Sequence, residues 1–408
     1  MAEPCRRSRV QSGKAKRSDI DGMQNARDTP TAEAKDLQAG ESDRLVATLL
    51  RNKDVMQRFS RAVGCADDFS VKTIELLRDA GALLAPLPTS GHGLGWGTEP
   101  VGTAPLATAL RIIGSASLAV GRIYEAHVNA VALIAKFARP AVREAAWADV
   151  RDGHLFGLWV ASGAEPVRLS RCGSSLRLIG TKPFCTAAGF VTRSIITFTC
   201  DDGQEQMVLL DAGEGRIEPT FHKMHGMRNT ATRPVSFDQD HDEAQCIGQP
   251  GDYFAEPDFT AGAWRTSAVT AGGLRSLVDE TITQLHATRR DRDPHQSRRI
   301  GLMLIQCETA RMWAEAAALR TVVPNMDSGD ITTYVNLART AVEQVCLDAI
   351  PLVQRSLGLK AMMMSNPVEA LIRDLATYLR QPAGDEILSE AAMHVAQRGL
   401  SVVDGYDR

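Results

Sequence analysis

The stretch "SLRLIGTKPFCTAAG", residues 175–189, marks a change in the periodicity of the chain. Short apolar runs that end in glycine, proline or small polar residues are typical of β-strands and their turns. Four more such runs surround it: "LFGLWVA" (155–161), "TRSIITFT" (192–199), "EQMVLLDA" (205–212) and "RPVSFDQ" (233–239). Five strands at this spacing predict a small barrel or sandwich between residues 151 and 256.

Helical patterns lie on both sides of this β region. Residues 41–150 begin with a candidate N-cap at Ser42, and two apolar helical stretches are expected at 101–124 and 127–138. After residue 257 come four long amphipathic stretches, enough for an antiparallel bundle: 268–289, 301–322, 334–358 and 367–380. The sequence therefore predicts a mainly α protein with a central β domain.

Composition and charge argue against a nucleic-acid-binding protein, a membrane-spanning protein and a disulfide-stabilised one. The 408 residues carry a formal net charge of -3, which gives no global field for nucleic acid or a membrane surface. No uninterrupted apolar stretch approaches the roughly 20 residues that span a bilayer. The eight cysteines are scattered without a CxxC pair, which favours reduced thiols and a cytoplasmic location. Residues 1–40 contain few large apolar side chains and are expected to be a disordered arm.

Four strings in this order resemble motifs of the acyl-CoA dehydrogenase flavoprotein family. They are "GALLAPLPTSGHGLG" (81–95), "LIGTKPFCTAAG" (178–189), "HGMRNTATRPVSF" (225–237) and "PVEALIRD" (367–374). The resemblance implies three domains: an N-terminal helical domain (41–150), a small β-barrel (151–256) and a C-terminal four-helix bundle (257–408). It also implies FAD between the last two domains, and a homodimer or homotetramer in which a neighbouring subunit assists.

The family's cofactor-binding positions can be carried over one by one. Thr186 would lie near flavin N5, Phe184 would cover one face of the flavin ring, and an arginine of the 289–292 segment would meet the pyrophosphate. The full set is Trp159, Val160, Ala161, Phe184, Cys185, Thr186, Arg289 (or Arg290 or Arg292), Gln354, Gly358 and Gly384. Taken alone, each of these residues is also typical of ordinary packing or of a solvated loop.

The family's catalytic base is missing from both places where it is expected. Its usual glutamate aligns with Pro382, and the alternative position on the first bundle helix holds Trp264, just before Arg265. Asp385 and Glu386 lie nearby but match positions that point elsewhere. No catalytic residue is therefore assigned, because proton abstraction requires a carboxylate within reach of the substrate carbon.

Three functions stay open at this stage. The first is an FAD-dependent oxidoreductase acting on an acyl thioester such as acyl-CoA, or on a related small molecule, with an unidentified electron acceptor. The second is a flavin monooxygenase of the same fold, fed by a reductase, with His92 or His127 handling protons. The third is a catalytically silent binding module. His127 on an apolar helix is more typical of a core histidine, and His222 and His225 lack the further ligands of a metal site.

Overall fold

The computed structural model describes residues 32–62, 71–172, 175–219, 224–241 and 245–404. The first helix, α1, begins at Ala32, so residues 32–40 are helical and the predicted arm is too long by that segment. Gln38 is buried and donates a hydrogen bond to the Leu94 carbonyl at 2.9 Å, which attaches the start of α1 to the loop after α2. Residues 1–31 lie outside the described residues.

The N-terminal part of the chain is helical, as predicted. Its helices are α1 (Ala32–Ala62), α2 (Val71–Asp79), α3 (Thr103–Ala116), α4 (Leu118–Phe137) and α5 (Pro140–Arg151). The predicted break near residue 125 is wrong, because the chain breaks at Ser117 instead. Ser117 is extended, and its hydroxyl accepts a hydrogen bond from the Val120 N–H, so it caps α4. One continuous helix therefore carries both Glu125 and His127.

The central part forms an eight-stranded sheet with the path β6-β7-β3-β2-β4-β5-β8, and β1 pairs in parallel with β4. The strands are β1 (Phe156–Trp159), β2 (Arg168–Cys172), β3 (Ser175–Cys185), β4 (Arg193–Thr199), β5 (Glu205–Asp211), β6 (Arg216–Ile217), β7 (Arg233–His241) and β8 (Cys246–Ile247). All five predicted β runs are strands.

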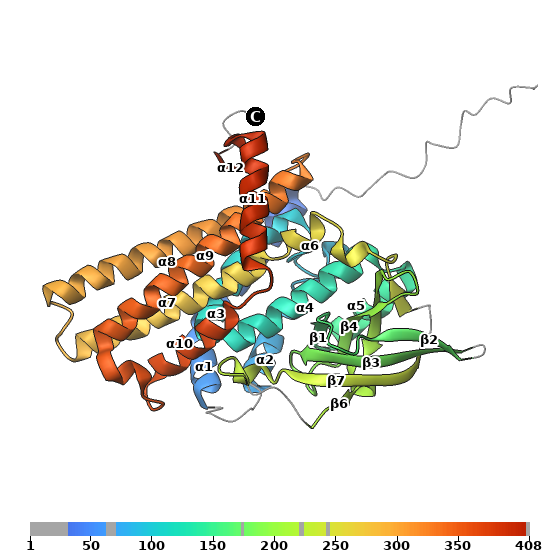
Figure 1. The fold of residues 1–408 in the computed structure, drawn as a ribbon, viewed down its shortest axis with the longest axis horizontal. Coiled ribbons are helices and arrows are strands. Elements are labelled where there is room, and N and C mark those ends of the chain that lie inside the picture. Colours follow the sequence, from blue (N-terminus) through green and yellow to red (C-terminus); the bar gives the residue numbers. More distant parts are fainter. Residues whose placement is uncertain (1–31, 63–70, 173–174, 220–223, 242–244, 405–408) are drawn as a thin grey trace, which may run out of the picture.

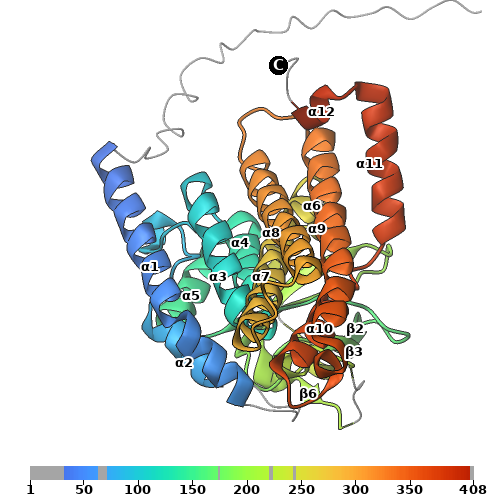
Figure 2. The same ribbon diagram turned by 90° about the vertical axis from the view of Figure 1, so that its left-hand side faces the viewer.

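The C-terminal part is a helical bundle with α11 lying along α9 at its edge (Figure 2). Its helices are α6 (Asp258–Ala261), α7 (Trp264–Ala287), α8 (Pro294–Arg320), α9 (Ser328–Leu357), α10 (Pro367–Tyr378), α11 (Gly384–Arg398) and α12 (Ser401–Asp404). Aspartates cap α8 and α9: Asp293 and Asp327 each accept hydrogen bonds from two backbone N–H groups. The four predicted bundle helices correspond to α7–α10.

Helix α4 packs against both β1 and α7, so it lies between the sheet and the bundle (Figure 1). By length and composition alone it is the one helix of the described residues that could cross a membrane, but 72% of its most apolar window is buried inside the protein. This burial is typical of a core helix.

His127 joins α4 to its neighbours. Its Nδ1 accepts a hydrogen bond from the Phe156 N–H at 3.1 Å, so the neutral ring donates from Nε2 to the Leu83 carbonyl at 2.9 Å. Burial lowers the pKa of His127 to about 4, and the hydrogen bond to Leu83 offsets part of that effect. His127 is therefore a satisfied core histidine.

We expect His127 to make the fold acid-sensitive. Its pKa lies below the ordinary value of 6.5, so between pH 6.5 and 4 the unfolded chain takes up a proton that the folded chain refuses. Stability is therefore lost as the pH falls, by about 3 kcal/mol over this window. Denaturant unfolding of wild type and His127→Gln at several pH values measures the difference. The same substitution at the exposed His295 is the control, and an equal acid slope in all three proteins would contradict the assignment.

Candidate functional site

A cavity of ≈ 1250 Å³ lies where α4, the sheet, α7 and the α10–α11 corner meet. Residues of each element line it, including Glu125 of α4, Val160 after β1, Trp264 of α7, Tyr378 of α10 and Pro382 of the corner. The predicted crevice between the β region and the bundle thus exists. Thr186 and the 381–383 segment, which the sequence placed on opposite sides of it, line the same cavity.

The sheet side of the cavity contains four of the predicted cofactor-binding residues: Val160, Ala161, Phe184 and Thr186. The pairing of β3 with β7 shifts register between Lys182 and Cys185, where Pro183 has no N–H for the ladder. After this irregularity Phe184 lies on the cavity with 49% of its surface exposed.

The turn after β3 is held from behind by two hydrogen bonds. Trp159 Nε1 donates to the Thr186 carbonyl at 2.9 Å, and the Ala187 N–H donates to the Thr230 carbonyl at 2.8 Å. The second bond fixes Ala187 at φ +56°, a backbone conformation that is uncommon for residues other than glycine. The side chains of Trp159 and Cys185 are buried and do not line the cavity, so they support its wall.

Lys182 is a second support of this wall. Its side chain is 1% exposed, and the ammonium donates to the Val160 carbonyl (2.9 Å), the Thr197 hydroxyl (3.0 Å) and the Ser162 hydroxyl (3.3 Å). Burial lowers the pKa of Lys182 to about 8, although Glu205 opposes this shift. The lysine thereby fixes the segment after β1 that forms part of the cavity.

The remaining predicted cofactor residues do not line the cavity. Arg289 lies exposed in the turn after α7, and Gln354 and Gly358 lie at the C-terminal end of α9. Both places are at the end of the bundle farthest from the sheet (Figure 1). Gly384 begins α11, just beyond the lining residues Pro382 and Ala383. A cofactor role for these residues stays a prediction.

Pro382 and Trp264, the two positions without a base, both line the cavity. Asp385 and Glu386 do not line it, and neither do His92 and His127. His92 is exposed in the glycine-rich loop. Neither histidine is therefore placed to exchange protons with a molecule in the cavity.

The structure describes only one of the two histidines at positions 222 and 225. His225 is exposed, and His222 lies outside the described residues.

A polar cluster on the helical side of the cavity was missed by the sequence reasoning. The Glu125 carboxylate accepts four hydrogen bonds: from the Tyr378 hydroxyl (2.9 Å), the Thr266 hydroxyl (2.9 Å), Asn129 Nδ2 (3.3 Å) and Arg122 Nη1 (3.4 Å). All of these residues line the cavity. The available signal was the pair of charges, Arg122 and Glu125, in the mainly apolar stretch 118–135.

Tyr378 and the neighbouring Arg265 both have shifted pKa values. Burial, together with the charge of Glu125, raises the pKa of Tyr378 well above its ordinary value, so its hydroxyl stays protonated and donates. Burial lowers the pKa of Arg265 to about 10, with Glu125 opposing the shift. Arg265 donates from Nη1 to Asn129 Oδ1 at 2.8 Å and lies over the Trp264 ring at 5.4 Å.

Two of the motifs behind the family resemblance meet at the cavity rim. Asp374 accepts a hydrogen bond from the Met227 N–H at 2.7 Å, and burial raises the pKa of this carboxyl. Gly226 packs against the backbone of Arg373, where a Cβ would approach the carbonyl oxygen to 2.2 Å. The "HGMRN" loop is therefore fixed to α10, which places Met227 and Thr230 on the cavity.

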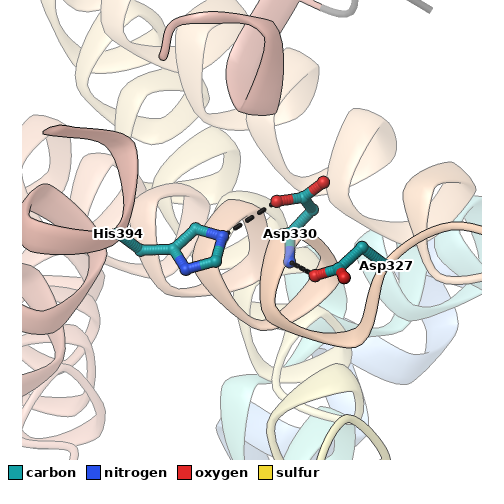
Figure 3. Close-up of side chains that lie close together, drawn as sticks. All are labelled: Asp327, Asp330 and His394. Atoms are coloured by element: carbon teal, nitrogen blue, oxygen red, sulfur yellow. Dashed lines mark hydrogen bonds and ion pairs between the residues drawn. The ribbon is translucent and has the colours of Figure 1, made fainter. Parts of the chain in front are cut away.

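Asp327, Asp330 and His394 form a separate group whose ligand atoms lie within 4.8 Å of one another (Figure 3). His394 Nε2 contacts Asp330 Oδ1 at 2.8 Å. The Arg398 guanidinium lies 3.6 Å from Asp330 and 3.7 Å from Asp327. Because a histidine and an arginine of α11 already pair with these carboxylates of α9, the group acts as a tether between the two helices.

Comparison with known proteins finds matches to this architecture among solved structures. No family model and none of the curated proteins matches the chain. Among solved structures, the dibenzothiophene monooxygenase TdsC from Paenibacillus sp. A11-2 matches with TM-score 0.71 and 18% identity, over 90% of this chain and 98% of that one. The same protein has been solved with FMN and indole.

Two further structures match over similar lengths. Butyryl-CoA dehydrogenase from Megasphaera elsdenii gives TM-score 0.75 and 15% identity, over 87% of this chain and 98% of that one. A nitrososynthase from Micromonospora carbonacea var. africana gives TM-score 0.69 and 16% identity, over 91% and 98%. The chain therefore has the acyl-CoA dehydrogenase fold, with an N-terminal helical domain, a small β domain and a C-terminal bundle, as the resemblance predicted.

We expect Lys182 to give the wall a measurable pH dependence. Between about pH 8 and 10.5 the folded protein has lost the proton of Lys182 while the unfolded chain still holds it, so the stability contribution of this residue rises with pH. The unfolding free energy of wild type minus that of Lys182→Met should increase by roughly 2–3 kcal/mol across this window. Lys72→Met, at an exposed site on α2, is the control. If this difference in unfolding free energy does not change with pH, burial does not lower the pKa of Lys182 and the prediction is wrong.

Proposed function

We propose that this protein is a flavin-dependent oxidoreductase, and that it oxygenates a small molecule rather than dehydrogenating an acyl thioester. The observation that carries the proposal is the pair Pro382 and Trp264. Both line the cavity where the family's base would have to lie, and neither has a titratable group. Removal of an α-proton needs a carboxylate within hydrogen-bond reach, so the dehydrogenation route has no base at this corner.

The residues on the sheet side fit a flavin ring. The cavity exceeds the roughly 300–1,000 Å³ of common ligand pockets, so it has room for a ring system and a substrate. Phe184 offers an exposed aromatic face, and Thr186 and the Val160–Ala161 backbone offer polar groups in a wall that Trp159 and Lys182 hold rigid. When bound, a flavin supplies two-electron redox chemistry and, once reduced, reactivity towards O₂.

The identity of the flavin depends on a second subunit. Within one chain, Arg289, Gln354 and Gly358 lie away from the cavity. They could meet the pyrophosphate (Arg289) and the adenosine part (Gln354, Gly358) of FAD only from a neighbouring copy. FAD in a homo-oligomer is therefore part of the proposal, and FMN is the alternative, because a TdsC structure contains FMN. Release of the cofactor by heat and its chromatography against both standards decides between them.

One side of the cavity is apolar, and the other side is polar. Phe184, Leu158 and Met227 make the surroundings of the proposed ring apolar, which limits water at the reacting centre. Opposite them, Tyr378 keeps its proton and donates to Glu125, whose carboxylate is engaged by four donors. Glu125 is therefore a positioning residue rather than a free base, and it orients Tyr378, Thr266 and Asn129 towards the cavity.

The purified protein should be yellow, and its oxidised flavin should not bleach rapidly with butyryl-CoA or octanoyl-CoA under anaerobic conditions. The reason is the absence of a base beside Pro382 and Trp264. Anaerobic stopped-flow absorbance with each thioester tests this, with dithionite as the control that the flavin can be reduced. Rapid bleaching by either thioester would instead show that the protein dehydrogenates acyl thioesters.

Oxygen use is a separate measurement on the same preparation. With a flavin reductase and NADH, substrate oxidation should require both O₂ and reduced flavin. A colourless protein that gains no flavin absorbance on titration with FAD or FMN would support the silent binding module.

A further inference from the structure

Two arginines and one carboxylate lie together where α4 and α7 line the cavity. Arg122 and Arg265 line this end, and Glu125 is the carboxylate between them. Arg122 pairs with Glu125 at 3.4 Å. The other lone pairs of Glu125 are taken by neutral donors, namely Tyr378, Thr266 and Asn129.

Arg265 has only neutral acceptors in the described chain. Nη1 donates to Asn129 Oδ1 at 2.8 Å, and Nη2 lies 3.4 Å from the Gly97 carbonyl. Its Nε is shielded from solvent and has no acceptor among the described residues. A guanidinium group has five N–H donors and remains charged at any physiological pH. This side chain therefore has unused donors and no direct ion pair with a described carboxylate, although the charge of Glu125 acts on it.

A guanidinium group without a direct ion pair has an energetic cost. Removing a cation from water is unfavourable unless an anion or several strong acceptors replace the lost hydration. The low pKa of Arg265, about 10, expresses this cost. An anion that enters the cavity would lower it, which makes the arginine a natural anchor for a charged ligand.

We propose that this end of the cavity is an anion-binding subsite, and that the substrate is a small organic carboxylate anchored by Arg265. A guanidinium binds a carboxylate through strong charge-assisted hydrogen bonds. The apolar and aromatic lining formed by Trp264, Phe184 and Met227 suits the rest of such a molecule. The substrate class rests on the proposed function, whereas the binding of a carboxylate does not.

The simpler interpretation is that Arg265 is a structural residue. It would then only link α7 to α4 and to the Gly97 loop through its two hydrogen bonds to neutral groups. That interpretation predicts that substitution of Arg265 changes stability and that the cavity does not prefer charged ligands over neutral ones. The two interpretations predict different relative affinities, because an anchoring arginine must distinguish a charged ligand from a neutral molecule of the same shape.

Isothermal titration calorimetry with benzoate and benzamide tests the subsite. Wild type should bind benzoate more tightly than benzamide. In Arg265→Met the benzoate affinity should fall about tenfold or more, with benzamide binding little changed. Arg275→Met is the matched control, because Arg275 lies exposed on the same helix in an ion pair with Asp279. Arg265→Lys keeps the charge without the guanidinium fork and should lie between wild type and Arg265→Met.

Each other outcome overturns the proposal. Equal binding of benzoate and benzamide, binding of neither, or equal loss of both in Arg265→Met would leave Arg265 a purely structural residue. Tighter binding of inorganic phosphate than of benzoate would assign the subsite to a phosphate group instead. If Arg265→Met does not fold, Arg265→Lys carries the test, and an unchanged preference for benzoate in that variant would count against the guanidinium anchor.

The calorimetry is run on protein as isolated and on protein saturated with FAD. Flavin absorbance reports the proposed function separately, so a failure of the subsite and a failure of cofactor binding are distinguishable.

Discussion

The buried carboxylate of Glu125 is the contact on which the cavity depends. It lies on α4, the helix between the sheet and the bundle, and accepts hydrogen bonds from Thr266 of α7 and Tyr378 of α10. A buried carboxylate is tolerated only when its lone pairs are satisfied, so these helices must keep a fixed mutual position. Because Tyr378 is four residues before Pro382, the same contact also fixes the corner that closes the cavity.

The opposite wall is held in the same way, by polar groups that lie behind the surface they support. Trp159 and Lys182 are almost fully buried, and their donors reach backbone carbonyls of Thr186 and Val160. Side chains of the wall are then free to face the cavity, since its backbone is fixed from the other side. A wall whose backbone is held in this way presents its groups in one fixed geometry, which a binding site requires.

The sequence predicted the fold well because its signals are local. Period and composition identified the β runs and the four bundle helices. The break at Ser117 was missed, because alanine-rich helical pattern continues on both sides of it and only the serine's cap geometry ends α3. The start of α1 at Ala32 was also missed, since the polar residues there resemble a disordered arm.

The site was predictable only in part, because its polar contacts join distant positions. Glu125 meets Thr266 and Tyr378 across 141 and 253 residues, and no local pattern records such pairings.

Arg265 and the α10–α11 corner line the same cavity. No described residue of that corner that lines the cavity is a carboxylate. Here the corner is Pro382, and the described carboxylates at its flank, Asp385 and Glu386, lie off the cavity. Among the described residues, Arg265 makes hydrogen bonds to neutral groups and no direct ion pair. A half-buried arginine that makes no ion pair among the described residues could gain the negative charge it lacks from the proposed carboxylate ligand.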